Sequence, residues 1–259
     1  MLTLINSLTY GVGSSTLVYF MAKTRSSLLS KPALIISSSD SLTYRHMLPV
    51  ANDWENPNLK MVLSKLQTYT DIKTFCYKVD SYLYYLNIEG SDLKTQSGRK
   101  EFNQLLREIK QDGVHEGFES IWVDLDNLSG GFMYFVDDVD LVLVPVPPNI
   151  IKLTTISERI LHLRQGYVAD FGMQMKIPIY YCVLPYASQL PLTKIKTILN
   201  TSDKYIIPVG YDVEIVRQFN QGKLHFYLNE VLAEPKTTEQ KTLHTHLKRL
   251  LKDLKPQRR

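Results

Sequence analysis

The sequence predicts an α/β protein built on a single doubly wound, mainly parallel sheet that is flanked by helices. Short apolar runs alternate with helix-like segments, which is the pattern of a parallel sheet covered on both faces. Residues 141–146 (LVLVPV) are almost continuously apolar, as expected of a strand buried on both faces. Neither an internal repeat nor a low-complexity linker interrupts the alternation.

Composition narrows the class of protein further. The chain has 259 residues, of which 44% are hydrophobic and 22% charged, and these values exclude disordered, collagen-like and disulfide-scaffold proteins. No apolar run reaches the roughly 18 residues that a membrane-spanning helix needs, and the amino end lacks the pattern of a signal peptide. Cys76 and Cys182 lie far apart in apolar or aromatic surroundings, which indicates reduced core thiols in a cytoplasmic protein.

The first two strand–helix units are expected before residue 76. Residues 2–8 form a short apolar run that stops at a glycine-containing loop, and a helix is expected from that loop to Lys23. Residues 33–36 follow a proline and form a second buried strand. Residues 55–75 are mostly polar with apolar residues at helical spacing, which predicts a helix.

The middle of the chain repeats this alternation. Residues 82–88 are aromatic and strand-like, and residues 97–111 form the clearest amphipathic helix of the sequence. Residues 120–123 form a strand that ends in Asp124, and residues 141–146 form the next strand.

The carboxyl-terminal part adds two strands and four helices. The strands are residues 177–184 and 205–208, and the helices are residues 156–173, 190–200, 212–221 and 238–255. Open sheets of this kind bind ligands at the carboxyl ends of their strands. A functional site is therefore expected among the loops that follow Leu8, Ile36, Asp124 and Val146.

The first of these loops has the arrangement of a phosphate-binding loop. Residues 2–17 (LTLINSLTYGVGSSTL) comprise a strand, a glycine loop and a helix start, which directs backbone N–H groups at an anion. The segment resembles the deviant Walker A motif K-G-G-x-G-K-T-T of the ParA/MinD family of P-loop ATPases. The matching residues are Gly11, Val12, Gly13, Ser15 and Thr16. Tyr10 replaces the first glycine of the motif, and Thr9 and Ser14 replace both of its lysines.

Four later segments resemble the same family in the right order, over roughly residues 1–230. Residues 118–126 (FESIWVDLD) are similar to its Walker B strand, and residues 137–146 (DDVDLVLVPV) are similar to the strand that follows. Residues 207–212 (IPVGYD) resemble the family's loop near the nucleotide base, and residues 219–223 (FNQGK) resemble a later helix end. The resemblance implies a P-loop NTPase-like fold, and its finer form suggests the TadZ-like branch.

The resemblance also implies a vestigial nucleotide site, in which Asp124 is the carboxylate on the Mg²⁺ side. Asp40 is displaced from the position of the family's water-orienting aspartate. Losing one preorganised donor typically costs about 10²–10³ in rate, so the loss of both lysines predicts no catalytic residue. The expected cofactor is none, or weakly bound ATP or ADP with Mg²⁺, and no separate metal site is expected. The implied nucleotide-binding residues are Gly11, Gly13, Ser14, Ser15, Thr16, Asp124, Pro208 and Asp212.

Each of these features has a simpler explanation that stays open. Gly11 and Gly13 are also what a tight strand–helix turn without a ligand needs, since glycine accepts positive φ. Asp124 is equally compatible with a carboxylate that caps the next turn. Residues 137–140 (DDVD) fit a solvated loop or a helix cap better than a metal cluster.

Positive charge is concentrated in residues 236–259, which are expected to form a basic amphipathic helix after an α/β domain of residues 1–235. This tail has eight basic and two acidic residues, a net charge of +6, whereas residues 1–235 carry 22 basic and 24 acidic residues. The favoured arrangement is a terminal helix that packs its leucines on the sheet with its lysines solvated, and the alternatives are contact with an anionic membrane surface or with a protein or nucleic-acid partner. The membrane or partner helix would use Leu247, Lys248, Arg249, Leu250, Leu251 and Leu254.

The resemblance predicts a catalytically degenerate ParA/MinD-like protein, a pseudo-ATPase that serves as a scaffold or positioning factor for a bacterial membrane-associated machine. The machine would serve secretion, pilus assembly or polysaccharide export, and the chain would contact protein partners as a homo- or hetero-dimer. It would lie in the cytoplasm, with peripheral contact at the inner face of the membrane as an open alternative.

Two other functions stay open. One is an active or weakly active ATPase switch for DNA partition or cell positioning, with the missing charge supplied by Lys23, Arg45 or a partner's lysine. The other is a nucleic-acid-binding module that uses the basic tail, although nucleic acid is the less expected partner.

Overall fold

A computed structural model describes residues 1–9, 13–38, 41–49, 54, 56–67, 71–88, 92–110, 117–125, 135, 139–186, 190–210 and 213–254. Within these residues, eight strands form one sheet in the order β3-β4-β2-β5-β1-β6-β7-β8. Neighbouring strands are parallel except for the antiparallel pair β3–β4. The strands are β1 (Leu2–Asn6), β2 (Ala33–Ser37), β3 (Tyr77–Lys78), β4 (Leu83–Asn87), β5 (Ser120–Leu125), β6 (Leu141–Val146), β7 (Ile179–Tyr186) and β8 (Ile206–Gly210).

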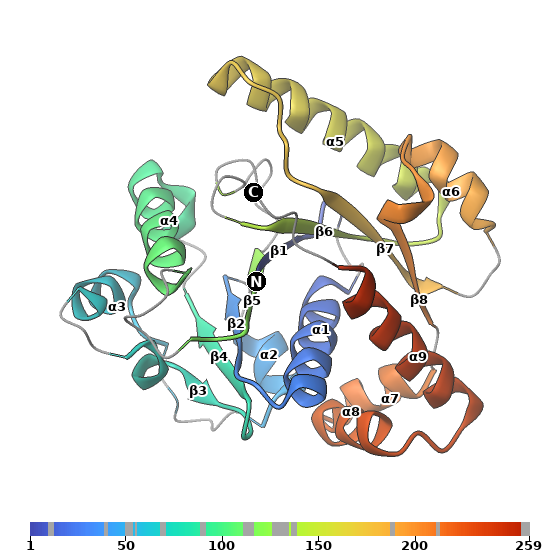
Figure 1. Ribbon diagram of the computed structural model, residues 1–259, viewed down its shortest axis with the longest axis horizontal. Coiled ribbons are helices and arrows are strands. Elements are labelled where there is room, and N and C mark those ends of the chain that lie inside the picture. Colours follow the sequence, from blue (N-terminus) through green and yellow to red (C-terminus); the bar gives the residue numbers. More distant parts are fainter. Residues whose placement is uncertain are drawn as a thin grey trace.

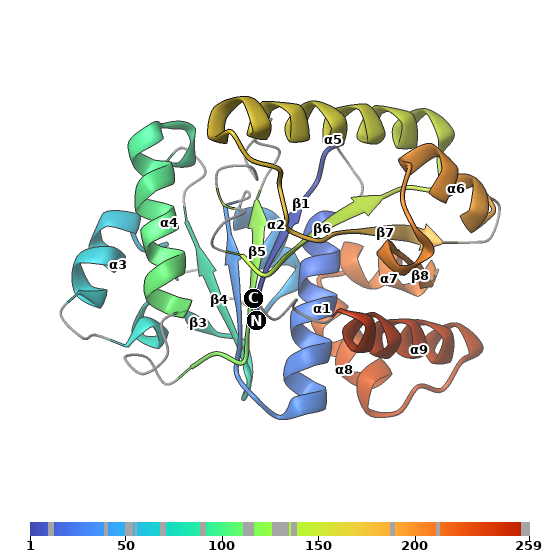
Figure 2. The same ribbon diagram turned by 45° about the horizontal axis from the view of Figure 1, so that its top comes forward.

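Helices cover both faces of this sheet, which confirms the predicted doubly wound α/β architecture (Figure 1). Helices α3 to α6 lie on one face, and α1, α2 and α7 to α9 lie on the other (Figure 2). The described helices are α1 (Ser14–Leu29), α2 (Ser41–Met47), α3 (Leu59–Leu66), α4 (Gln96–Lys110), α5 (Ile150–Phe171), α6 (Leu192–Leu199), α7 (Val213–Asn220), α8 (Leu224–Ala233) and α9 (Thr238–Asp253). The 3₁₀ turns are η1 (Ile72–Phe75), η2 (Asp92–Lys94) and η4 (Asp203–Tyr205).

The two faces of the sheet belong to two separate apolar cores. In β6, Val142 and Val144 point into the core under α5, whereas Leu141 and Leu143 point into the core that contains α1 and α9. Successive strand residues point to opposite faces, so a strand between two cores must be apolar at every position. This explains the uninterrupted apolar run that the sequence shows in β6.

Several elements differ from the sequence prediction. Helix α1 continues beyond Lys23 to Leu29. Its C-cap residue, Ser30, has a φ of 51° and donates its N–H to the Ser26 carbonyl oxygen. Helix α5 begins before residue 156, because the Asn149 side chain accepts a hydrogen bond from the Lys152 N–H and caps the helix there. The single helix predicted over residues 55–75 is divided into α3 and η1. The sequence prediction missed α2, α8 and the short strand β3.

Helix α9 is part of the second core. Thr237 and Gln240 form a reciprocal capping box at its start, and the helix contacts β8, α1 and α8. A Cβ atom added at Gly210 of β8 would lie 2.9 Å from the His246 Nδ1, so this close approach of helix and strand requires glycine. Four leucines of the helix are almost completely buried: Leu243, Leu247, Leu250 and Leu254.

This packing is the arrangement that the sequence favoured for the tail, a terminal helix with its leucines inside. Leu247, Leu250 and Leu254 fill the protein's own core, and Leu251 is half-buried against it. Lys248 and Arg249 remain exposed on the outer side of the helix. The leucines named for a membrane or partner helix are therefore used inside the protein, which corrects that alternative. No helix in the described part of the chain is long and apolar enough to cross a membrane.

Candidate functional site

Buried polar residues gather at the carboxyl edge of the central strands. Asn6 ends β1, Ser37 ends β2, Asn87 ends β4, and Asp124 lies one residue before the end of β5. The register places Ser37 beside both Asp124 and Asn87, and all four residues are nearly inaccessible to solvent. Because buried polar groups need hydrogen-bond partners, this edge has a defined polar geometry.

The start of α1 lies at this edge and is open to an anion. Gly13 has a φ of 78° and a ψ of 32°, the left-handed region that glycine adopts readily. Within the described part of the chain no side chain caps this helix start, and its first turn contains no acidic residue. The partial positive charge of a helix N-terminus therefore meets no described carboxylate of its own first turn. Of the residues predicted for the loop, Gly11 lies outside the described residues.

The Asp124 carboxylate accepts hydrogen bonds from two hydroxyl groups. The Ser15 Oγ donates to the Asp124 Oδ2 over 2.7 Å, and the Tyr44 phenol donates to the same oxygen over 2.8 Å. The backbone carbonyl of Asp124 accepts a hydrogen bond from the Ser38 N–H over 3.0 Å. Asp124 is 1% exposed. The structure thus brings together two of the predicted site residues, Ser15 and Asp124, which are 109 positions apart in sequence.

Tyr44 is a residue of this site that the sequence prediction missed. It lies on α2, is completely buried, and stacks on Tyr85 with ring centroids 4.9 Å apart. Burial, together with the negative charge of Asp124, raises the pKa of the Tyr44 phenol well above its ordinary value. The phenol therefore remains a hydrogen-bond donor throughout the physiological pH range. Its only signal in the sequence was its place shortly after the second strand.

A cation approaches the same edge from α5. The guanidinium of Arg159 donates a hydrogen bond to the Leu8 carbonyl oxygen, just before the glycine loop. Next to it, the Ser7 hydroxyl donates to the Thr9 carbonyl oxygen, whereas the buried Thr9 hydroxyl has no hydrogen-bond partner among the described residues. Arg159 was not predicted, because nothing in its local sequence connects it with a loop 151 positions earlier.

The two cations that the sequence suggested as replacements for the lysines bind elsewhere. The Lys23 Nζ lies 2.5 Å from the Asp80 Oδ2, and Lys23 is buried there. The Arg45 guanidinium donates to the Trp54 carbonyl oxygen over 3.1 Å. Both residues are therefore engaged away from the start of α1, which corrects the expectation that either supplies the missing charge.

The remaining predicted residues are less closely associated. The Thr16 hydroxyl makes a weak contact with the Met47 Sδ at 3.9 Å, and Ser14 is half-buried at the start of α1. Pro208 lies on β8, and β1, β6 and β7 separate this strand from β5. Asp212, like Asp40, lies outside the described residues.

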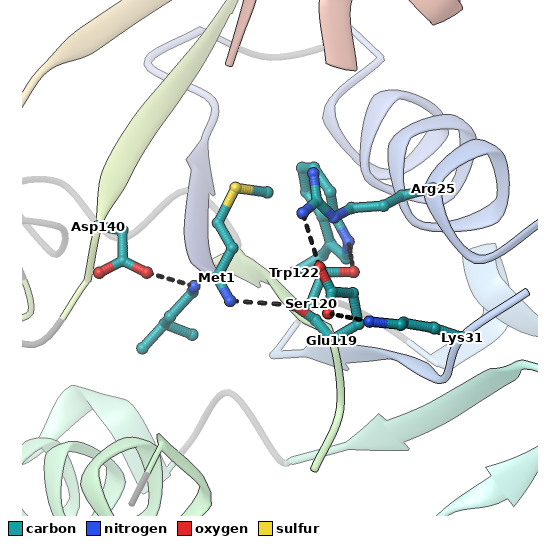
Figure 3. A network of polar contacts seen from close by, with 8 residues as sticks. Met1, Arg25, Lys31, Glu119, Ser120, Trp122 and Asp140 are labelled. Carbon is teal, nitrogen blue, oxygen red and sulfur yellow. Dashed lines mark hydrogen bonds and ion pairs between the residues drawn. The ribbon is translucent and has the colours of Figure 1, made fainter. Parts of the chain in front are cut away.

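At the amino edge of the central strands, charged groups form a network of ion pairs and hydrogen bonds (Figure 3). The Met1 amino group donates to the Glu119 carbonyl oxygen over 3.0 Å, and the Leu2 N–H donates to the Asp140 Oδ2 over 2.8 Å. Arg25 and Lys31 lie 3.1 and 3.4 Å from the Glu119 carboxylate oxygens. Asp140 is therefore part of this structural network, and no described group of three His, Cys, Asp or Glu side chains could hold a metal ion.

Comparison with known proteins identifies the fold. No protein-family model matches the chain, and no curated protein matches it. Among solved structures, MinD of Aquifex aeolicus is 20% identical; it covers 100% of this chain and 99% of its own, with a TM-score of 0.69. The MinC:MinD complex from the same organism gives 20% identity, coverage of 100% and 98%, and a TM-score of 0.67.

Two further structures have the same architecture. A ParA-family ATPase of Chlorobium tepidum TLS is 13% identical, covers 96% of this chain and 98% of its own, and has a TM-score of 0.68. MinD of Pyrococcus horikoshii OT3, complexed with Mg-ADP, is 12% identical, covers 96% of each chain, and has a TM-score of 0.65. The chain is thus structurally similar over its full length to MinD and ParA ATPases, and its fold is that of these P-loop proteins.

Proposed function

We propose that this chain is a catalytically degenerate ParA/MinD-like protein, which serves as a scaffold or positioning factor for a bacterial membrane-associated machine. The observation that carries the proposal is the environment of Asp124. The Asp124 carboxylate accepts hydrogen bonds from two neutral hydroxyl groups, those of Ser15 and Tyr44. The related motif has two lysines close to this site. Ser14 and Thr9 stand at the lysine positions of the motif, and they carry no charge.

The loss of catalysis follows from the chemistry of phosphoryl transfer. The reaction depends on positioning and on electrostatic stabilisation of the phosphoryl oxygens, and the protein contributes little covalent chemistry. Each missing preorganised donor costs about 3–4 kcal/mol of transition-state stabilisation. Arg159 donates to the Leu8 carbonyl oxygen, and Lys23 and Arg45 are bound elsewhere.

The loop retains the elements that hold a phosphate group weakly. The left-handed Gly13 and the uncapped start of α1 leave backbone N–H groups for an anion. The Pyrococcus MinD structure contains Mg-ADP, which makes ADP or ATP the first ligand to test here. In this proposal, Ser14, Ser15 and Thr16 contact the phosphates and Pro208 lies toward the base. Asp212, the other residue that the resemblance assigns to the base, lies outside the described residues.

Protein partners are the second part of the proposal. MinD of Aquifex aeolicus is found in a complex with MinC, so this fold is known to carry a protein partner in that case. We infer that the present chain acts likewise through its surfaces, as a homo- or hetero-dimer, at the inner face of the membrane. The finer suggestion of secretion, pilus assembly or polysaccharide export comes from the TadZ-like resemblance alone.

Release of phosphate from ATP is the test of catalytic degeneracy. The wild-type chain and the Asp124→Asn variant should release phosphate at the same rate as a protein-free control. Ser14→Lys, with Ser14→Gln as its matched control, should raise ADP affinity by restoring one cation beside the loop. Phosphate release by the wild-type chain that Asp124→Asn abolishes would contradict the proposal and would favour an ATPase switch.

The outer face of α9 favours a second candidate function, contact with an anionic surface or polymer such as nucleic acid. Lys241, Lys248 and Lys252 are exposed at helical spacing, while the leucines of the helix are buried. Truncation is an unsuitable test because it removes core residues. Binding to duplex DNA should instead be measured at several salt concentrations, since each phosphate contact adds about 0.9 to the log–log slope. Lys248→Gln with Lys252→Gln should lower that slope, whereas salt-independent binding would contradict this function.

A further inference from the structure

The polar geometry around Asp124 bears on a question that the fold itself raises, namely whether a divalent cation accompanies a bound phosphate. Carboxylates that serve Mg²⁺ sites use their oxygens either for the ion or for its water molecules, because Mg²⁺ demands near-octahedral coordination and usually keeps several waters. Here the Oδ2 of Asp124 already accepts two hydroxyl protons, at 2.7 and 2.8 Å. With two hydroxyl donors on Oδ2, the arrangement at this oxygen does not fit such an ion.

We propose that the Tyr44 phenol takes the place of a metal-bound water at Asp124, so that a phosphate group at the start of α1 is held without a divalent cation. The ligand, a nucleoside diphosphate or triphosphate, rests on the proposed function. The replacement of the metal rests on the contacts of Tyr44, Ser15 and Asp124 alone.

The position of Tyr44 is fixed by packing rather than by its hydrogen bond alone. Its side chain is completely buried and stacks on Tyr85, whose ring lies 5.7 Å from that of Trp54. A cation at the Asp124 Oδ2 would face the hydroxyl protons of Ser15 and Tyr44. Two different helices, α1 and α2, hold these hydroxyl groups in place. Moving the phenol aside would disrupt an aromatic stack in the core, which opposes metal entry.

The same contacts explain how an anion can lie near a buried carboxylate. A carboxylate that accepts two hydroxyl hydrogen bonds has part of its charge compensated by those dipoles. The uncapped first turn of α1 then supplies donors to the phosphate, and the Arg159 guanidinium adds a positive charge beside Leu8. In this arrangement the protein's own dipoles and one arginine compensate the negative charge that Mg²⁺ compensates elsewhere.

Metal and nucleotide titrations on the wild-type chain and two variants test the proposal. Tyr44→Phe removes the hydroxyl and keeps the ring, and Tyr85→Phe makes the same change on the tyrosine that stacks on Tyr44. Mn²⁺ binding is measured alone by calorimetry and by the paramagnetic signal of the free ion. The affinity for ADP is then measured in EDTA and in Mg²⁺.

For the wild-type chain and for Tyr85→Phe, the ADP dissociation constants in EDTA and in Mg²⁺ should agree within about twofold, a difference below about 0.5 kcal/mol. Tyr44→Phe should gain Mn²⁺ affinity and should bind ADP at least about tenfold more tightly with Mg²⁺ than without it. A wild-type chain whose ADP affinity rises tenfold with Mg²⁺ overturns the proposal. A Tyr44→Phe variant with no gain in Mn²⁺ affinity also overturns it.

Failure of the proposed function gives a different result. If ADP binds in neither buffer, the nucleotide-holding part of the proposed function is wrong. The comparison of Mn²⁺ binding between the wild-type chain and Tyr44→Phe needs no nucleotide, so it still decides whether the phenol stands in the place of a metal-bound water.

Discussion

The two edges of the sheet compensate the negative charge of their carboxylates in different ways. At the amino edge, Glu119 and Asp140 are compensated by full positive charges from Arg25, Lys31 and Lys110. At the carboxyl edge, Asp124 is compensated by hydroxyl dipoles, and it is far more deeply buried than either of those carboxylates. Helix α1 contributes to both edges, with Arg25 in one network and Ser15 in the other.

Under the proposed function, the amino edge is structural and the carboxyl edge holds the ligand. Charge pairs that are partly exposed contribute modestly to stability and are weakened by salt. At the carboxyl edge the buried Asp124 accepts hydrogen bonds from neutral hydroxyls, whose contribution depends little on salt. The comparison therefore predicts that the amino edge responds to salt and acid, whereas the carboxyl edge responds to the loss of buried hydroxyls.

The largest expected effect is on the carboxyl edge. Tyr44→Ala should lower the free energy of unfolding by about 3–5 kcal/mol, because it empties a fully buried aromatic site. Tyr44→Phe should lower it by about 1–3 kcal/mol, the cost of losing one hydrogen bond to a buried charge. Urea unfolding of both variants measures these differences. Equal losses for the two variants would mean that the hydroxyl rather than the ring carries the stability.

A smaller effect is expected at the amino edge. Glu119→Gln should lower the free energy of unfolding by about 0.5–1 kcal/mol at low salt, because its ion pairs are partly exposed. In 1 M salt, where the screening length is about 3 Å, the difference from the wild-type chain should shrink. Glu158→Gln, at an exposed position on α5, is the matched control. A loss that persists unchanged in high salt would contradict the assignment of this edge to ion pairs.

The two edges should also differ in their response to pH. Burial alone would raise the pKa of Glu119, but hydrogen bonds and charges from Arg25 and Lys31 bring this pKa below its ordinary value of 4.5. A lowered carboxyl pKa contributes stability above the unfolded-state value, and this stability is lost as the pH falls. Glu119→Gln should therefore flatten the loss of stability below about pH 4.5.

At alkaline pH, the dependence of stability on pH is expected to come from Tyr44. Burial, followed by the charge of Asp124, raises the pKa of its phenol above the ordinary value of 10.0. Above that pH the unfolded chain releases a proton that the folded chain retains, so stability falls as the pH rises. Tyr44→Phe should reduce this alkaline slope, and the exposed Tyr82→Phe should leave it unchanged. Unfolding free energies measured from pH 3 to pH 11, about the range of the two groups, would separate the two edges.

The smallest change in stability is expected for Arg159. Arg159→Gln should alter the free energy of unfolding by no more than about 0.5 kcal/mol, because the residue is exposed. The same variant should weaken ADP binding about fivefold, equivalent to about 1 kcal/mol of lost attraction. Arg164→Gln, on the same helix, is the control. Equal ADP affinity for the two variants would remove Arg159 from the anion site.

Much of the fold could be predicted because its signals are local. The alternation of apolar runs and amphipathic segments predicted every strand except the two-residue β3, and the continuous apolar run of β6 predicted burial on both faces. Helix α8 was missed because its apolar residues surround the helix: Phe226 is 65% exposed while Leu228 is buried. Helix α2 has only seven residues, which is too short for a clear helical periodicity in the sequence.

The candidate site could be predicted only in part, because some of its residues are far apart in the sequence. Gly13 and Ser15 follow one another in a recognisable motif, and Asp124 ends a recognisable strand. Tyr44 and Arg159 are brought to the site by the packing of α2 and α5, across 80 and 151 positions of sequence. Their side chains have no local pattern that points to Asp124 or to Leu8, so only the folded arrangement reveals them.

The position of β1 has a consequence for how the chain is made. Within this chain β1 is made before its sheet neighbours β5 and β6, which lie more than a hundred residues later. At about 5–20 residues per second, about 6–25 s pass between the synthesis of β1 and that of β5. During that time both edges of β1 lack their partner strands, so a chaperone that shields nascent segments should increase the yield of folded protein.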